Sequence, residues 1–140
     1  MTEHLCVICG RYYKTSASHH MESVCQTCRE KRPELYGATR TLLTQKTRAR
    51  AAGVRADLTL TEWIRTIDDF GGRCAYCGQR PYTVMEHYVA IRFGGGTTAS
   101  NCVPACGSCN VMKAKAELGK AAFPVDALER VGRYLTRRAA

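Results

Sequence analysis

The sequence predicts an α+β fold held together by two structural zinc ions. Three observations support this prediction. Eight of the nine cysteines form four Cys-x-x-Cys pairs, several stretches carry helix-start and helix-stop signals, and a glycine-rich segment lies between the last two cysteine pairs. The chain has 140 residues, which is enough for one modest domain or for two small ones that depend on metals.

Composition narrows the class of protein. Hydrophobic residues make up 45% and charged residues 24% of the chain, which argues against a disordered protein. No apolar run approaches 18 residues, so we expect no membrane span, and the first residues lack the pattern of a secretory signal. Lys and Arg number 21 against 12 acidic residues, a formal charge of +9. This excess favours a polyanionic partner, with nucleic acid as the first candidate.

The cysteine pairs predict two zinc sites. Without a secretory signal we expect a reducing compartment, where metal ligation is favoured over disulfides. Two Cys-x-x-Cys knuckles supply the four sulfurs of a tetrahedral site, whereas redox-active dithiols belong to a βαβ pattern that is absent here. Bound zinc would reduce the net charge to about +5. The ninth cysteine, Cys102, is expected to be a small buried residue. The predicted ligands are Cys6, Cys9, Cys25 and Cys28 for the first ion and Cys74, Cys77, Cys106 and Cys109 for the second.

Residues 1–32 are predicted to form the first zinc module. Four cysteines already complete its metal site, so His19 and His20 are expected in a solvent-exposed loop. A segment this short cannot bury its own core, and metal binding would supply much of its folding energy. A basic helix is expected within residues 33–54, with a start at Pro33 and a stop at Gly53. It is either a solvated linker or a helix laid along phosphates. Its cationic side chains are Arg40, Lys46, Arg48 and Arg50.

Two further helices are expected on either side of the third and fourth cysteine pairs. Thr59 and Glu62 have the spacing of a capping box, and Leu58 and Trp63 that of a hydrophobic staple. This helix would run to about Phe70 and open a core unit over residues 55–118. Residues 119–140 would hold a last helix from about Val125 to Arg138. Its apolar stripe is expected to comprise Val125, Leu128, Val131 and Leu135.

The segment between the third and fourth cysteine pairs holds the candidate chemistry. Glu86 and His87 are adjacent, so a strand would point them to opposite faces unless a turn separates them. A glycine-rich loop and a return into a helix would bring Asn110 near both. Carboxylate and amide oxygens suit a hard ion such as Mg²⁺ or Mn²⁺, and a neutral imidazole can take a proton from water. These groups together are those needed for phosphodiester hydrolysis.

These residues resemble the HNH endonucleases of the ββα-metal fold, in their cysteine-bearing zinc subset. The approach from Leu58-Thr-Leu-Thr-Glu-Trp63 to Phe70-Gly-Gly-Arg-Cys74 is similar to that of small phage-encoded members. The resemblance covers roughly residues 55 to 115. It implies a treble-clef-like ββα core with a structural zinc, preceded by a helix and the small N-terminal four-cysteine module. The motifs that carry it are Cys74-Ala-Tyr-Cys77-Gly, Glu86-His87, Gly94-Gly95, Asn101, and Cys106-Gly-Ser-Cys109-Asn110 with Lys113.

The resemblance also implies catalytic roles. His87 matches the general base, and Asn101 the asparagine that orients the loop carrying it. Glu86, where the family usually has aspartate, and Asn110, often histidine, match the ligands of a catalytic divalent ion, Mg²⁺, Mn²⁺ or a similar metal. Ala90 stands where a proline is frequent. From the residues alone, Asn110 could instead cap a helix, Asn101 could be a turn residue, and His87 a structural histidine.

The expected function is therefore a metal-dependent HNH DNA endonuclease that nicks or cuts both strands. The alternative is a non-catalytic, zinc-dependent nucleic-acid-binding module. Arg92, Lys113 and Lys115, with the cations of the basic helix, are candidate phosphate contacts. The resemblance makes phage terminase and portal proteins candidate partners in genome packaging. It also suggests a cytoplasmic protein, in the host cytoplasm if phage-encoded, with no membrane partner.

Overall fold

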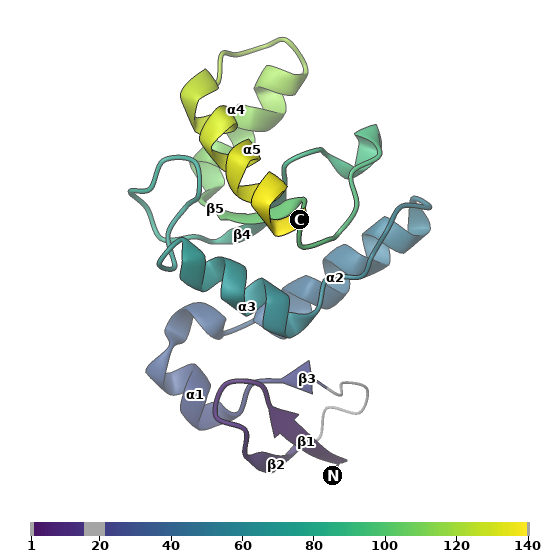
Figure 1. The fold of residues 1–140 in the computed structure, drawn as a ribbon, viewed down its shortest axis with the longest axis vertical. Coiled ribbons are helices and arrows are strands. Elements are labelled where there is room, and N and C mark those ends of the chain that lie inside the picture. The colour runs from purple at the N-terminus through teal and green to yellow at the C-terminus, as the bar shows by residue number, and fades with distance from the viewer. Residues whose placement is uncertain (1, 16–21, 140) are drawn as a thin grey trace.

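The N-terminal part of the chain forms a small sheet and a short helix. The computed structural model describes residues 2–15 and 22–139 (Figure 1); His19 and His20 lie outside this part. Strand β1 (Thr2–Cys6) pairs antiparallel with β2 (Tyr12–Thr15) and parallel with β3 (Glu22–Ser23), giving the order β2-β1-β3. Helix α1 (Gln26–Lys31) follows directly.

The expected basic helix is shorter than the sequence suggested. A 3-10 turn, η1 (Pro33–Leu35), comes first, and helix α2 begins only at Ala38 and ends at Ala51. Gly37 separates the two at φ 77°, a left-handed conformation that glycine adopts freely and that an α-helix does not contain. The expected stop is confirmed, because Gly53 follows α2 at φ 74°.

Helix α3 (Leu60–Asp69) has the predicted capping box. The Thr59 hydroxyl accepts the Glu62 backbone N–H at 3.1 Å, and the Glu62 carboxylate accepts the Thr59 N–H at 3.0 Å. These two bonds satisfy donors that a helix start otherwise leaves unpaired. Leu58 and Trp63, the predicted staple, are both completely buried in one core. The cap therefore fixes where the chain enters the helix.

The centre of the molecule is a hairpin followed by a helix. Strands β4 (Val84–His87) and β5 (Cys102–Ala105) pair antiparallel, with Glu86 opposite Val103 and His87 opposite Cys102. Between them lies a 3-10 turn, η2 (Ile91–Phe93), and helix α4 (Gly107–Glu117) follows β5 directly. This ββα unit with its four cysteines confirms the predicted α+β, treble-clef-like class.

The last helix, α5 (Val125–Ala139), buries a slightly different stripe from the one expected. Val131 and Leu135 are buried as predicted, but Val125 is 65% exposed. The apolar contact nearest the start of the helix comes instead from Ala127, which is 5% exposed. The prediction for Val125 was wrong because this first residue of α5 lies just before the packed stretch, which begins at Ala127.

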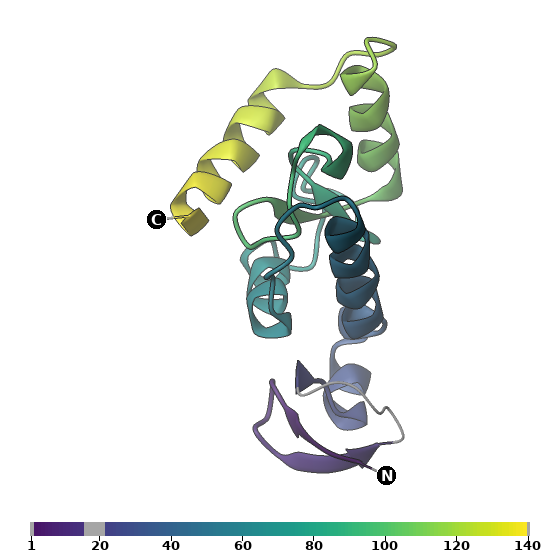
Figure 2. The same cartoon turned by 90° about the vertical axis from the view of Figure 1, so that its right-hand side faces the viewer.

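Two cores organise these elements into layers. One joins the N-terminal module, α2, α3, Met85 and Cys102, and the other joins α5, the second cysteine group and Val103. Figures 1 and 2 show α2 and α3 between the N-terminal module and the hairpin, with α4 and α5 beyond it. Helix α2 thus packs into the molecule, with Leu42 and Ala49 buried. Within the described part of the chain no helix is long and apolar enough to span a membrane.

Candidate functional site

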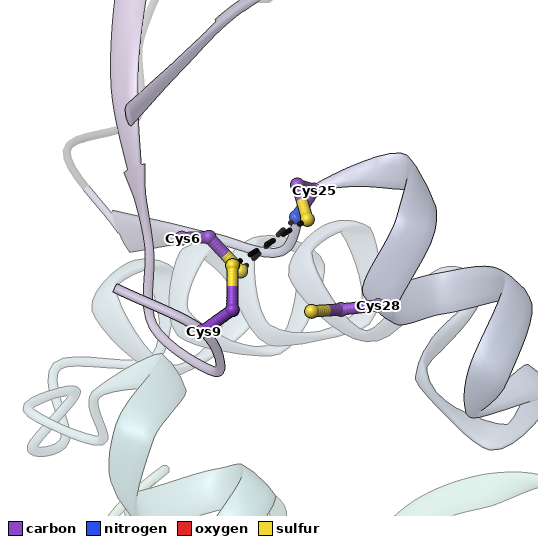
Figure 3. Close-up of side chains that lie close together, drawn as sticks. All are labelled: Cys6, Cys9, Cys25 and Cys28. Carbon is purple, nitrogen blue, oxygen red and sulfur yellow. Dashed lines mark hydrogen bonds between the residues drawn. The ribbon is translucent and has the colours of Figure 1, made fainter. Parts of the chain in front are cut away.

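The first four-cysteine group ties the N-terminal sheet to α1 (Figure 3). Cys6 ends β1, Cys9 lies in the turn that follows, and Cys25 and Cys28 lie at the start of α1. All four sulfurs lie within 4.8 Å of one another. Burial opposes ionisation of Cys6, but N–H groups from Cys25, Cys9 and Ile8 lower its pKa to about 6. The four sulfurs are close enough to hold one metal ion, which would favour their thiolate forms.

The second group repeats this arrangement in the ββα unit. Cys74 and Cys77 lie in a turn before β4, and Cys106 and Cys109 at the start of α4, with all four sulfurs again within 4.8 Å. Cys106 is the N-cap residue of α4, and its sulfur accepts the Cys109 N–H at 3.4 Å. Burial disfavours its thiolate, but this bond and the Arg80 guanidinium lower the pKa of Cys106 to about 6. A metal ion held by this group would anchor α4 beside the hairpin.

A cavity of about 370 Å³ lies beside β4. All four residues of the strand line it, which means that it follows the edge that β5 leaves open. The predicted site residues Glu86, His87 and Asn110 line this same cavity. Three further polar side chains complete it: Gln45 and Arg48 from α2 and Glu117 from α4. Of these, the sequence analysis named only Arg48, as a candidate phosphate contact, and did not place it in this site. Arg92, from η2, also lines the cavity.

Glu86 is held from two sides. The Tyr76 hydroxyl donates to Glu86 Oε2, and the ammonium of Lys113 lies 2.9 Å from Oε1. Glu86 and Lys113 are 6% and 4% exposed. Burial raises the pKa of Glu86, while the Lys113 charge and the Tyr76 hydroxyl oppose that shift. The carboxylate therefore has a fixed position, with lone pairs left over for another partner.

Lys113 differs from its expected role as a surface phosphate contact. Besides Glu86, its ammonium lies 2.7 Å from Glu117 Oε1 and donates to the Tyr88 carbonyl at 2.8 Å. An ammonium has three protons to donate, so these partners saturate Lys113. It pairs with both carboxylates of the cavity rather than reaching solvent. Lys115, by contrast, is exposed on α4.

His87 presents one nitrogen to the protein and keeps the other open. Nε2 lies 2.9 Å from Thr97 Oγ1, and that hydroxyl donates its proton to the Gln45 carbonyl at 3.1 Å. With its proton used, the hydroxyl accepts from Nε2, which places the neutral ring's proton on Nε2. Nδ1 has no partner in residues 2–15 and 22–139 and is not among their fully buried unpaired atoms. Nδ1 is thus an unprotonated nitrogen that solvent reaches.

The His87 imidazole is kept neutral. Burial is the main cause, and the charges of Arg48 and Lys113 add to it, lowering the pKa of His87 to about 4. At neutral pH the ring is therefore a proton acceptor rather than a cation.

Asn101 braces the loop that follows His87. Its side-chain oxygen accepts the Val89 N–H at 2.8 Å, and its amide nitrogen donates to the carbonyls of Val89 at 3.0 Å and Gly96 at 2.8 Å. Gly95 lies beneath this amide, where a Cβ would collide with the Val89 carbonyl oxygen. Side-chain and backbone groups thus fix the path between β4 and β5.

Asn110 lies in the first turns of α4, and it does not cap the helix. The N-cap residue is Cys106, so the capping alternative for Asn110 is wrong. Asn110 is half-buried and lines the cavity. It lies on the same face of α4 as Ala114 and Glu117, which also line the cavity. The Asn110 amide is therefore available to a ligand in the cavity.

The fold and the cavity together define a class of protein: a ββα unit with four cysteines that could hold a metal ion, and with a neutral histidine beside oxygen-bearing side chains in one cavity. Residues 74–116 match the family model of the HNH endonucleases. This match confirms the resemblance seen in the sequence.

One curated protein is similar over part of the chain. It is the "SPbeta prophage-derived putative HNH endonuclease YoqL" of Bacillus subtilis (strain 168), 28% identical over 78 residues. The alignment covers 46% of this chain and one third (33%) of that relative. No solved structure matches the chain significantly.

Sequence reasoning found the residues of the motif but missed those that support them. Tyr76 and Thr97 are separated from their partners by ten positions each, and Gln45 by 52 from Thr97. Glu117 could have been found from the sequence, because it follows Asn110 by two helical turns and therefore lies on the same face of α4. The contribution of α2 to the cavity left no local trace, because it depends on tertiary packing.

Proposed function

We propose that this chain hydrolyses phosphodiester bonds in DNA at the cavity beside β4. The observation that supports this most directly is His87, a neutral imidazole with its Nδ1 open, in one cavity with Glu86 and Asn110. The match of residues 74–116 to the HNH endonucleases supports the same reaction. The prophage origin in the relative's name is consistent with a role in phage genome processing, with DNA, terminase and portal as candidate partners.

The reaction assigns a proton transfer to His87. Nδ1 takes a proton from water as the water oxygen bonds to phosphorus, and the P–O3′ bond breaks, with the released 3′ oxygen gaining a proton from solvent. The bond from Nε2 to Thr97 holds the ring while its charge changes, as an orienting partner does for a catalytic base. Asn101 positions His87 indirectly, through the loop that starts at Val89.

The oxygen ligands of the cavity fit a hard divalent cation. Glu86 and Asn110 are the side chains that would hold it, in line with Mg²⁺ or Mn²⁺ preferences. A bound divalent ion supplies stabilisation of negative charge on the phosphate oxygens and the leaving oxygen. Lys113 already compensates part of the Glu86 charge, so we expect the cation to bind weakly without DNA.

The two four-cysteine groups have a structural role in this proposal, with zinc as the metal. Four thiolates leave no open position on a tetrahedral zinc ion. The second site holds the turn before β4 and the start of α4 together, and hence Glu86 and Asn110 on neighbouring walls. The first stabilises the module that packs against α2 and α3.

The test is cleavage of supercoiled and linear DNA with Mg²⁺, Mn²⁺ and other divalent ions, for the wild-type protein and His87→Ala. We expect wild type to cut and the variant to lose at least ~100-fold of the rate, since a positioned general base contributes 10²–10⁴-fold. Both proteins should retard DNA equally on a gel. Retardation without cleavage by wild type under every metal would leave a nucleic-acid-binding module instead.

A further inference from the structure

Arg48 is placed where a substrate phosphate would lie. It comes from α2, outside the matched segment of residues 74–116, yet it lines the same cavity as His87, Glu86 and Asn110. The basic helix therefore places one of its cations beside the candidate base.

The charge of Arg48 is not neutralised by the protein. Of the two arginines that line the cavity, Arg92 lies 3.5 Å from Glu117 Oε2, whereas Arg48 forms no ion pair with any described residue. Lys113 is saturated by Glu86 and Glu117. The other cations beside the cavity, Arg92 and Lys113, are paired with carboxylates. The Arg48 guanidinium has no such partner and is therefore suited to bind an anionic ligand.

One turn of α2 holds both the guanidinium and the support of the base. Arg48 Nη1 donates to Gln45 Oε1 at 2.7 Å, and the Gln45 carbonyl accepts the Thr97 hydroxyl at 3.1 Å. The same hydroxyl lies 2.9 Å from His87 Nε2. Arg48 and His87 are thus positioned by one chain of contacts, as substrate binding and proton transfer at one phosphate require.

We propose that Arg48 donates hydrogen bonds to the non-bridging oxygens of the phosphodiester that is cleaved, so that α2 is part of the active site. A guanidinium presents its N–H groups as a planar fork that matches two phosphate oxygens. This inference rests on the proposed nuclease function. It separates Arg48 from Arg40 and Arg50, which lie on α2 but not along the cavity.

The kinetic test compares Arg48→Ala with Arg48→Lys and with Arg65→Ala. Arg65 is exposed on α3, outside the cavity. Arg65→Ala therefore removes one positive charge from the protein without changing the lining of the cavity. We expect kcat for Arg48→Ala to fall ~100-fold or more, as for loss of one transition-state donor, with partial recovery in Arg48→Lys. Equal kcat values for Arg48→Ala and Arg65→Ala, or a change confined to KM, would overturn the proposal.

A binding test keeps this result separate from the proposed function. The dinucleotide thymidylyl-thymidine, which has one phosphodiester, is titrated into the zinc-loaded full chain without other divalent ions, while the arginine Nε–H signals are followed by NMR. The Arg48 signal should shift and the Arg65 signal should not. An unmoved Arg48 signal at saturation refutes the contact. A shift in a protein that never cuts DNA would retain the phosphate contact and reject the nuclease.

Discussion

The ammonium of Lys113 lies 2.9 Å from Glu86 Oε1, and both side chains are buried. A buried ion pair contributes little net stability compared with apolar residues, but removal of one member leaves the other charge uncompensated. The buried negative charge of Glu86 is therefore compensated only as long as Lys113 is present.

We predict that Lys113→Met lowers the free energy of unfolding by about 3–5 kcal/mol. The physical reason is the unpaired buried charge of Glu86, so Lys113→Met combined with Glu86→Gln should recover a large part of the loss. Urea denaturation of zinc-loaded protein measures both. A single variant within about 1 kcal/mol of wild type would show that the pair is not desolvated.

The low pKa of His87 predicts a pH dependence of stability. The unfolded chain gains a proton near pH 6.5 and the folded protein only near pH 4, so the His87 contribution is constant above pH 6.5 and falls as the pH drops towards 4. The full difference is roughly 3 kcal/mol. Comparison of wild type with His87→Gln by urea denaturation at pH 7, 6, 5 and 4 isolates it from cysteine protonation. Parallel curves for the two proteins would contradict the assignment.

Metal content should be two ions per chain. Cys109→Ser should reduce it to one, because three thiolates bind zinc far more weakly than four, and Cys9→Ser should do the same at the other site. Cys102→Ala is the matched control, since Cys102 is buried but belongs to neither four-cysteine group. Elemental analysis after dialysis gives the count. A wild-type value of one or zero would show that one or both four-cysteine groups do not hold a metal ion.

The side chain of Asn101 should decide how rigid the loop after His87 is. Asn101→Ala removes three hydrogen bonds and leaves the Val89 N–H unpaired. We expect the free energy of unfolding to fall by about 1–3 kcal/mol. Exchange of the Val89 amide hydrogen should become faster, and cleavage slower. Asn101→Asp keeps an acceptor for Val89 but cannot donate to the two carbonyls, so its effect should also be large. Ser100→Ala serves as the control.

The sequence predicted the parts of this molecule that depend on local spacing. The Cys-x-x-Cys pairs and the capping box at Thr59 are set by residues a few positions apart, so their patterns survive without tertiary information. The ββα unit, whose strands β4 and β5 lie far apart in the sequence, was implied only by the resemblance to the HNH endonucleases. The break before α2 was missed because Gly37 also suits a helix interior at a modest cost.

The cavity was predicted only on one side. Glu86, His87 and Asn110 follow from the motif, whereas the role of Lys113 depends on which way α4 faces after packing. Burial turns a cation that would bind phosphate at the surface into the partner of two carboxylates. Pairing of this kind is a property of the folded core and not of the sequence around Lys113.

The bond from Thr97 to the Gln45 carbonyl limits how this nuclease candidate can be divided. A fragment trimmed to residues 74–116 would keep the cysteine knuckles and the motif but lose the acceptor that sets the imidazole's tautomer. Recombination that replaces the N-terminal half of the chain would also replace Gln45 and Arg48, which line the cavity beside β4. Any graft onto a new scaffold must therefore carry α2 with it.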